Sequence, residues 1–284
     1  ELQETFNNLE HQFNPWGFAP ETRAEWCREL DVALMSDRPE AKILYFVGCA
    51  GSYDDRGKVV ARAIVNLLKK AEIDFAILGP EERCTGDAAR RAGNEYVAQE
   101  LIQANLDTLS KYKPDRILTG CPHCFNTLKY EYPQFGAIPE VLHHTEFFAD
   151  LIQNGRLKPK EKLQTTVTLH DSCYLCRWND MIGAPRQILG AIGGLQIREM
   201  DRSGRKGLCC GAGGSRMFME EKIGKRINLE RVEEVAATKA ETLVAACPFC
   251  NTMLNDGVKE TASPVAVKDI AEILDQATGS GHML

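Results

Sequence analysis

Short apolar runs alternate with longer amphipathic stretches along most of this chain, beginning at Ala41. The apolar runs have the length of buried strands, and the stretches between them repeat apolar residues at helical spacing. Strands are expected at residues 43–47, 74–78, 116–119 and 140–144, and helices near residues 57–71, 87–111 and 146–152. Strands that alternate with helices are typical of βαβ units. The pattern therefore predicts an α/β fold with a parallel sheet.

The same plan recurs in the second half of the chain. Strands are expected at residues 166–169, 195–200 and 242–246, and a helix near residues 184–192. The repeat is also visible in individual residues, since residues 117–124 match residues 243–250. The first segment is Ile117-Leu118-Thr119-Gly120-Cys121-Pro122-His123-Cys124, and the second is Leu243-Val244-Ala245-Ala246-Cys247-Pro248-Phe249-Cys250. Residues 265–267 and 270–274 likewise echo residues 141–150. This repeat predicts two pseudo-symmetric lobes, each a small parallel sheet flanked by helices.

Polar segments set the expected boundaries of the lobes. The first lobe is assigned to residues 41–154 and the second to residues 162–277, because a polar linker with glycine and proline occupies residues 154–161. A helical N-terminal arm is expected at residues 1–40, with a polar linker at 1–14 and an amphipathic helix over 21–34. The tail, residues 278–284, is expected to be disordered. The start without methionine suggests a fragment or a processed subunit of a larger protein, with ferredoxin or transmembrane segments missing.

Composition excludes several classes of function. The 284 residues carry a net charge of -6 from well-mixed charges, and the absence of a basic run argues against nucleic-acid binding. No run approaches about 18 consecutive apolar residues, so no membrane span is expected in this segment. Eleven cysteines, grouped as Cys-x-x-Cys and Cys-Cys, favour metal ligation in a reducing compartment over a secreted disulfide framework. A cytoplasmic location is therefore expected.

Five cysteines of the second lobe have the spacing of a metal centre. Thirty-five residues separate Cys173 from the adjacent pair Cys209-Cys210, and thirty-six separate that pair from Cys247, which begins a Cys-x-x-Cys turn ending at Cys250. Each gap can hold a helix and a strand and so return the sulfurs to one place. Five thiolates that include an adjacent pair suit a polynuclear iron–sulfur cluster better than a four-ligand zinc site. Zinc is the remaining alternative.

The predicted strands place these cysteines at one edge of each sheet. Loops at the carboxyl ends of parallel strands form the functional edge, and the clustered cysteines fall just after predicted strands. Helices that follow them would aim backbone N–H groups at the thiolates, and Pro122 and Pro248 suit a first helical turn. The run Gly211-Ala212-Gly213-Gly214 is interpreted as letting the backbone approach inorganic sulfide, with a dinucleotide site as the alternative.

The first lobe differs from the second at one position. Cys84-Thr85-Gly86 stands where Cys209-Cys210-Gly211 stands later, so Thr85 replaces the fifth thiol. The four thiols of this doubtful second site are Cys49, Cys84, Cys121 and Cys124. Three outcomes are open for it: a conventional four-cysteine iron–sulfur cluster, a zinc site, or no metal.

Two residues near Cys173 are candidates for a catalytic role. His170, followed by Asp171, either donates a proton or hydrogen bond near the cluster or is a satisfied core histidine. Cys176 completes a further Cys-x-x-Cys with Cys173 and is expected to be inert, with a spare ligand or a redox-active thiol as alternatives.

The remaining candidates are interpreted as structural. The lone Cys27 is expected to be a packed small apolar residue. His143 and His144 are expected to be structural because Val267 and Lys268 occupy the matching positions of the other repeat. Solvated positions, with partner docking as the alternative, are expected for Arg90, Arg91 and Arg216.

The doubled pattern of Cys, then Cys-Cys-Gly, then Cys-x-x-Cys resembles the cysteine-rich domains of the heterodisulfide reductase family over roughly residues 41–275. Details such as Asn14-Pro15-Trp16-Gly17 and Gly211-Ala212-Gly213-Gly214 resemble the branch of iron–sulfur oxidoreductases that pair with electron transfer flavoprotein. The resemblance implies that a complete five-cysteine motif binds a noncubane [4Fe-4S] cluster, here in the second lobe through Cys173, Cys209, Cys210, Cys247 and Cys250. The first lobe lacks the fifth cysteine, which favours single-cluster electron transfer over two-cluster disulfide cleavage.

The leading hypothesis is an iron–sulfur oxidoreductase domain that passes electrons between a flavoprotein and a membrane quinone pathway. Its expected partners are an electron-transfer flavoprotein and further redox or membrane subunits, which would hold it at the inner face of the membrane. One alternative keeps the cluster but assigns heterodisulfide or thiol-disulfide reduction of a small substrate. Another is a zinc-stapled structural subunit that only docks larger partners.

Overall fold

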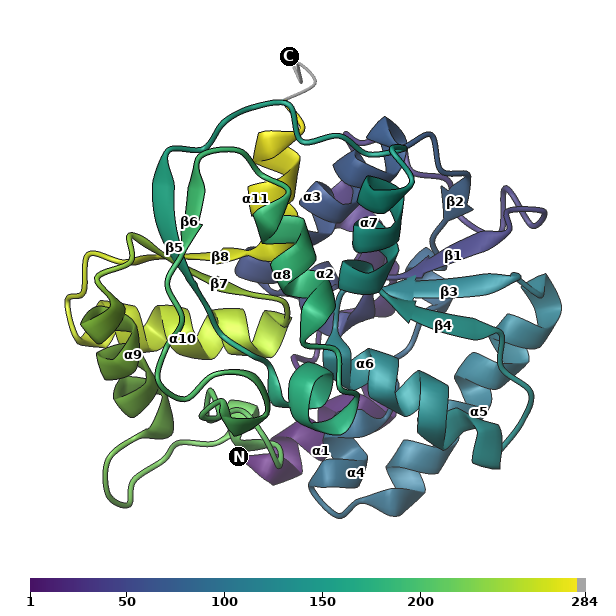
Figure 1. Ribbon diagram of the computed structural model, residues 1–284. Helices are drawn as coiled ribbons and strands as arrows, with labels where there is room; N and C mark the ends of the chain where they lie inside the picture. Colours follow the sequence, from purple (N-terminus) through teal and green to yellow (C-terminus); the bar gives the residue numbers. More distant parts are fainter. Residues whose placement is uncertain (280–284) are drawn as a thin grey trace. The chain divides into compact units, whose positions relative to one another are not determined.

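The computed structural model describes residues 1–279, and the chain divides into two compact units. Unit 1 comprises Glu1–His143 together with Gly214–Glu220, and unit 2 comprises His144–Gly213 together with the chain from Glu221 onward. Each unit contains one four-stranded parallel sheet with helices around it (Figure 1). The predicted fold class of two α/β lobes with a helical N-terminal arm is confirmed.

The sheet of unit 1 has the strand order β2-β1-β3-β4. Its strands are β1 (Ile43–Phe46), β2 (Phe75–Ala76), β3 (Arg116–Thr119) and β4 (Glu140–His143). Its helices are α1 (Leu2–Gln12), α2 (Gly48–Tyr53), α3 (Asp55–Lys70), α4 (Asp87–Arg91), α5 (Glu95–Tyr112) and α6 (Pro122–Asn126). Leu44 and Phe46 of β1 are fully buried, as expected for an apolar strand covered on both faces. Asp54 begins α3 by accepting a hydrogen bond from the backbone N–H of Gly57.

The sheet of unit 2 repeats this topology in the order β6-β5-β7-β8. Its strands are β5 (Thr165–Leu169), β6 (Leu195–Ile197), β7 (Thr242–Ala245) and β8 (Ala266–Asp269). Its helices are α7 (His144–Gln153), α8 (Gly183–Gly190), α9 (Ile227–Thr238), α10 (Pro248–Glu260) and α11 (Ile270–Ala277). Helix α7 packs against α8 and α11, and residues 154–161 connect it to β5 within this unit.

The internal repeat extends to backbone conformation. Gly86 and Gly211 have φ angles of 88° and 98°, and each follows the cysteine-containing loop of its unit. Lys113 ends α5 and Lys239 ends α9 with φ angles of 49° and 55°. These matched left-handed positions show that Cys84-Thr85-Gly86 and Cys209-Cys210-Gly211 correspond in structure as well as in sequence.

Two predictions for the N-terminal arm were wrong. Residues 1–14 are not a polar linker, because Leu2–Gln12 forms helix α1, which buries Leu9 completely. Residues 21–34 are not one amphipathic helix, because a 3₁₀ helix ends at Cys27 and Leu34 pairs with Ile77 beside β2. Backbone hydrogen bonds on either side of Leu34 join this segment to the sheet edge, and this tertiary pairing outweighs local helix propensity.

The predicted helix 87–111 is also two helices in the structure. Gly93 breaks it with a φ of 89°, and the Asn94 side chain then begins α5 by accepting a hydrogen bond from the backbone N–H of Val97. The tail prediction falls mainly on residues 280–284, which lie outside the described residues.

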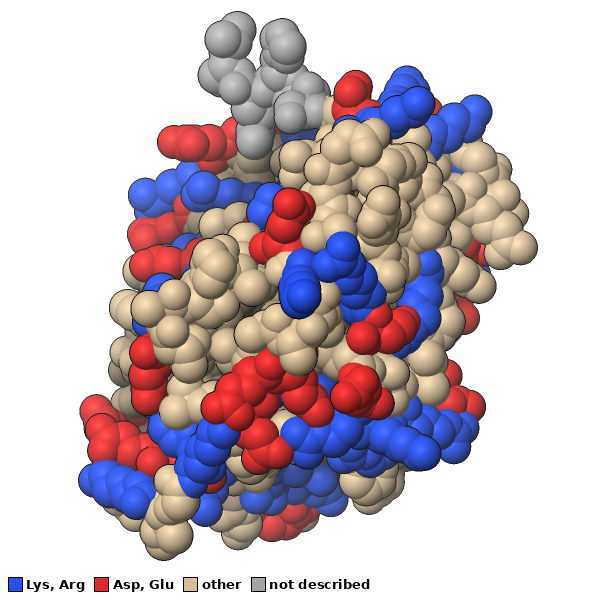
Figure 2. Space-filling view, turned by 60° about the vertical axis from the view of Figure 1, so that its left-hand side comes forward, with Lys and Arg blue, Asp and Glu red and all other residues tan. Residues whose placement is uncertain are grey.

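Acidic and basic side chains both occur on the face displayed in Figure 2. Within residues 1–279, no helix combines the length and the apolar character needed to cross a membrane.

Candidate metal centre

Five of the six cysteines of unit 2 come from three segments at the carboxyl edge of its sheet. Cys173 follows β5, and Cys247 follows β7 as the residue that precedes α10. Pro248 occupies the first turn of α10, where no N–H donor is needed, and places Cys250 in that same turn. Cys209 and Cys210 lie in the loop before α9. The βαβ topology therefore brings together residues that are far apart in sequence.

These thiols form one continuous group. Hydrogen-bonding contacts join Cys173 to Cys209, Cys209 to Cys210, Cys210 to Cys250, and Cys250 to Cys247. Cys210, Cys247 and Cys250 are buried, whereas Cys173 and Cys209 are only partly covered. The group thus has an interior side and a side that reaches solvent.

Protons are unevenly shared within the group. Hydrogen bonds from Cys173 and Cys210, followed by the backbone N–H of Gly211, hold the pKa of Cys209 well below its usual range. The contact with Cys209 in turn raises the pKa values of Cys173 and Cys210. Cys209 is therefore the most acidic thiol of the three. A bound metal would let all of them ionise, because coordination deprotonates a thiol.

The donor set fits an iron–sulfur cluster. Thiolates are soft ligands that favour zinc and iron–sulfur centres, and five of them exceed the four of a closed zinc tetrahedron. Position 211 favours glycine because its backbone has a φ of 98°, in the left-handed region. A Cβ at this position would also lie 3.2 Å from Cε of Met253. A Cβ at Gly213 would meet no atom within 4 Å, so there is open space beside this loop.

His170 lies against the buried side of the thiol group. One of its ring nitrogens and the Sγ atoms of Cys210 and Cys250 lie within 4.8 Å of one another. The Nε of Arg231 donates to Nδ1 of His170 at 3.2 Å. Burial, followed by the charge of Arg231, lowers the pKa of His170 to about 3. The imidazole is therefore neutral at physiological pH.

Cys176 is held away from the proposed ligands by Asp171. Its Sγ donates to Oδ1 of Asp171 at 3.2 Å, and that carboxylate accepts two hydrogen bonds from Arg186 at 2.8 and 2.9 Å. Burial, followed by the negative charge of Asp171, raises the pKa of Cys176. This environment favours a protonated, unreactive thiol.

The four candidate ligand thiols of unit 1, which are Cys49, Cys84, Cys121 and Cys124, are all buried, and they occupy the matching sheet edge. Cys49 contacts Cys84, and Cys121 contacts Cys124. The Thr85 hydroxyl lies 3.9 Å from Sγ of Cys124, just as Cys210 contacts Cys250 in unit 2. Thr85 therefore occupies the place of the fifth thiol.

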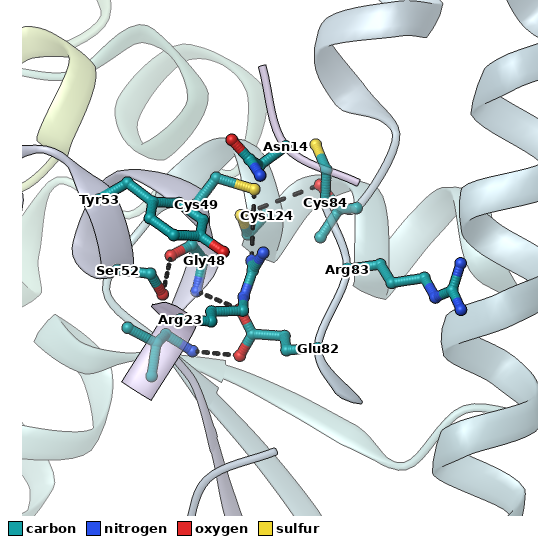
Figure 3. A network of polar contacts seen from close by, with 12 residues as sticks. Asn14, Arg23, Gly48, Cys49, Ser52, Tyr53, Glu82, Arg83, Cys84 and Cys124 are labelled. Atoms are coloured by element: carbon teal, nitrogen blue, oxygen red, sulfur yellow. Dashed lines mark hydrogen bonds and ion pairs between the residues drawn. The ribbon is translucent and has the colours of Figure 1, made fainter. Parts of the chain in front are cut away.

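A buried arginine contacts this second thiol set, as Figure 3 shows. Nη2 of Arg23 donates to Sγ of Cys49 at 3.3 Å and to Oε1 of Glu82 at 2.8 Å. Burial alone would raise the pKa of Cys49, but the hydrogen bond from Cys84 and the charge of Arg23 outweigh it and bring the pKa to about 7. Sequence reasoning missed Arg23, Glu82 and Arg231, because only long-range packing distinguishes them from solvated surface charges.

The other candidate residues have structural surroundings. Cys27 is buried, and its Sγ donates to the carbonyl of Ala24 at 3.1 Å. His144 lies 3.4 Å from Asp269 inside unit 2, and the buried ring of His143 packs on Phe125 in unit 1.

The predicted surface arginines differ in their contacts. Arg90 and Arg91 both pair with Glu131, so they take part in a local ion-pair network. Arg216 begins a short 3₁₀ turn that belongs to unit 1.

The sequence is similar to several redox proteins. It is 42% identical to the "Probable iron-sulfur-binding oxidoreductase FadF" of Bacillus subtilis (strain 168) and 44% identical to the "EtfAB:quinone oxidoreductase" of Syntrophomonas wolfei. Both alignments cover 98% of this chain but 41% of the relative, so the chain spans about two fifths of their length. It is also 36% identical to a dihydromethanophenazine:CoB–CoM heterodisulfide reductase subunit of Methanosarcina barkeri, covering 98% of this chain and 68% of that protein.

The sequence pattern of the CCG cysteine-rich domain matches residues 43–129 and 167–255. The two matches contain the candidate ligand cysteines of both units, and they confirm the resemblance predicted from the doubled cysteine motif. With both units accounted for, the chain belongs to the CCG cysteine-rich domain family, alongside the heterodisulfide reductase subunits.

Proposed function

We propose that unit 2 binds a noncubane [4Fe-4S] cluster through Cys173, Cys209, Cys210, Cys247 and Cys250. The observation that carries this proposal is the unbroken series of contacts among the five thiols. A bound cluster of this kind supplies one-electron redox chemistry. The names of the relatives, which include iron–sulfur and heterodisulfide reductase proteins, support an iron–sulfur cofactor.

The five cysteines have two roles, which are holding the cluster and exposing one side of it to a partner. Cys210, Cys247 and Cys250 hold the group from the buried side, and the partly exposed Cys173 and Cys209 form the side that a redox partner can approach. Such an edge suits electron transfer, which requires close approach of a partner and no enclosed substrate pocket. We therefore assign the chain to the electron-transfer part of an iron–sulfur oxidoreductase.

The proposed partners are an electron-transfer flavoprotein on one side and a membrane quinone pathway on the other. The name of the Syntrophomonas relative, an EtfAB:quinone oxidoreductase, supports this pairing. We place the chain in the cytoplasm at the inner face of the membrane, held there by other segments or subunits. Anaerobic mixing with reduced flavoprotein should bleach or shift the cluster absorbance within one turnover. No spectral change with any flavoprotein donor would contradict this assignment.

We propose that unit 1 does not bind a noncubane cluster, because Thr85 occupies the position of its fifth thiol. Metal content separates the remaining outcomes for Cys49, Cys84, Cys121 and Cys124. A chain with one [4Fe-4S] cluster contains about four iron atoms, and a chain with a second conventional cluster contains about eight. Zinc alongside about four iron atoms would indicate a zinc site in unit 1.

Replacement of one ligand tests the five-thiol site directly. Cys210→Ser should lose at least half of the bound iron, or change the electron paramagnetic resonance spectrum of the cluster, because an alcohol is a poor ligand for iron–sulfur centres. Cys176→Ser is the matched control, since Asp171 holds that thiol apart, and it should keep wild-type iron and spectra. A Cys210→Ser variant with wild-type iron and spectrum would disprove the five-ligand assignment. Zinc with negligible iron in anaerobically purified wild-type protein would instead support a structural role.

A further inference from the structure

A charged side chain is buried beside the histidine that borders the unit 2 thiols. Arg231 of α9 is fully buried, although an arginine is rarely placed in a protein interior. Nη1 of Arg231 donates to the carbonyl of Arg202 at 2.9 Å and also contacts Glu234. Its Nε donates to Nδ1 of His170. Arg231 is thus anchored through Nη1 and presents its Nε–H to the imidazole, while its buried Nη2 has no hydrogen-bond partner within residues 1–279.

This hydrogen bond fixes the tautomer of His170. An arginine can only donate, so Nδ1 of His170 must be the acceptor, and the single proton of the neutral ring must lie on Nε2. Nε2 is buried, and it has no hydrogen-bond partner within residues 1–279. A buried donor without a partner is energetically costly, which is a sign that a group normally occupies the space beside it.

The thiol group lies where that donor needs a partner. A ring nitrogen of His170 is within 4.8 Å of Sγ of Cys210 and Cys250, and Nδ1 is already engaged by Arg231. Nε2 is therefore the nitrogen available to this sulfur-rich site. Because Nε2 carries a proton, it can donate to sulfur but offers no lone pair to a metal.

We propose that Arg231 locks His170 as an N–H donor to the sulfur atoms of the unit 2 cluster, and so raises its reduction potential. This proposal rests on the proposed cluster in unit 2. His170 is then a positioning and tuning residue that does not ligate iron. Arg231 acts through it by holding the proton on the nitrogen that faces the sulfurs. Hydrogen bonds to sulfur and other outer contacts are known levers on iron–sulfur potentials.

Unit 1 lacks both parts of this device. By strand register, Phe46 of β1 stands at the position of His170, because Phe46 pairs with Thr119 two residues before Cys121. Asn105 of α5 stands at the position of Arg231, counted from the matched helix ends at Lys113 and Lys239. The Asn105 side chain instead donates hydrogen bonds to the backbone carbonyls of Arg83 and Cys84. The Arg231–His170 pair is therefore specific to unit 2, which carries the complete five-cysteine motif.

Redox titration of the full chain, followed by electron paramagnetic resonance, tests the proposal. His170→Leu should lower the midpoint potential, so that at a fixed applied potential the ratio of reduced to oxidised cluster falls about tenfold, which is about 59 mV for a one-electron couple. His170→Gln keeps an N–H donor near the same place and should restore most of that difference. Arg231→Met, which frees the ring to move its proton, should give an intermediate decrease, and Arg231→Lys should lie near wild type.

A second buried histidine of the same unit provides the control. His144→Gln should leave the midpoint potential unchanged. Equal potentials in wild type, His170→Leu and Arg231→Met would overturn the inference while leaving the five-thiol cluster intact. If His170→Leu does not retain iron, the Gln and Arg231 variants still decide the question.

Nuclear couplings distinguish a donor from a ligand. In protein with ¹⁵N-labelled histidine, pulsed electron paramagnetic resonance should show a weak nitrogen coupling that is lost in both His170→Gln and His170→Leu. It should also show an exchangeable proton that is lost in His170→Leu. A strong coupling typical of directly bound nitrogen would show that His170 ligates iron and would refute the proposed role. Wild-type protein without a cluster signal would instead refute the proposed function itself.

Discussion

Arg23 and Glu82 form a charged pair inside unit 1, with side chains 2% and 1% exposed. The Glu82 carboxylate accepts hydrogen bonds from Nε and Nη2 of Arg23 and from the backbone N–H groups of Val47 and Gly48. Four donors satisfy both carboxylate oxygens, which offsets much of the desolvation cost of burying the pair. The pair also fixes the junction between β1 and α2, and Cys49 lies in the first turn of α2.

Removal of the arginine should therefore be costly. We expect Arg23→Leu to destabilise unit 1 by about 3–5 kcal/mol, because Glu82 would remain buried without its cation. Urea unfolding, followed by a probe in unit 1, measures this change. Arg28→Leu, at an exposed neighbour whose side chain is 74% accessible, should change the midpoint little. A similar loss in both variants would mean that the effect belongs to the arm in general and does not depend on the buried pair.

Single residues also mark the limit of prediction from sequence. The five candidate ligands could be predicted as one group because their three segments follow predicted strands of a parallel α/β pattern. They are Cys173, Cys209, Cys210, Cys247 and Cys250. Arg23 and Arg231 could not, because their burial depends on partners 59 and 61 residues away, Glu82 and His170. Local sequence gives an arginine in a helical segment the same appearance whether it faces water or the core.

Among the elements, those with strong apolar patterns agree with prediction and those shaped by tertiary contacts do not. Strands β1, β3, β5 and β7 lie within a residue of the expected bounds, because their apolar side chains have one favourable environment. The arm segment near Leu34 departs from its helical pattern because Ile77 offers backbone hydrogen bonds at the sheet edge. Helix α5 begins later than expected because Asn94 supplies a cap after Gly93.

The loop before α9 should be sensitive to one methyl group. Gly211→Ala forces a left-handed residue to carry a Cβ, which costs about 1–2 kcal/mol, and it also crowds Met253. Because Gly211 donates its N–H to Sγ of Cys209 at 3.3 Å, the variant should retain less iron than wild type. Iron per chain after anaerobic purification measures this loss. Gly213→Ala is the matched control, since its Cβ would enter open space, and equal iron in both variants would contradict the argument.

At the scale of the whole molecule, one segment from the second half of the chain belongs to unit 1. Gly214–Glu220 follows the Cys209-Cys210 motif of unit 2 but is part of unit 1. Ser215 donates to the carbonyl of Ala88 at 2.8 Å, and the Phe218 ring meets Trp16 edge to face with centroids 5.8 Å apart. This return could not be predicted from the sequence, because the repeat places residues 214–220 with the second lobe.

Truncation of Phe218 should therefore weaken unit 1. We expect Phe218→Ala to lower the unfolding free energy of unit 1 by about 1–2 kcal/mol, since an edge-to-face pair and part of an apolar contact would be lost. Hydrogen exchange of α1 and α4 should accelerate, with unit 2 amides unchanged. Trp178→Ala, at a side chain that is 72% exposed, should leave these rates as in wild type. Faster exchange confined to unit 2 would contradict the assignment of this segment.

The return of Gly214–Glu220 to unit 1 also has a consequence for how the protein is made. A ribosome releases residues 1–143 first, yet the contacts of Ser215 with Ala88 and of Phe218 with Trp16 cannot form until the Cys209-Cys210 pair has also emerged. The nascent first unit must therefore remain incomplete, with part of its surface uncovered, while the second half is translated. Unit 1 therefore completes its folding only after Cys209 and Cys210 of unit 2 have been translated.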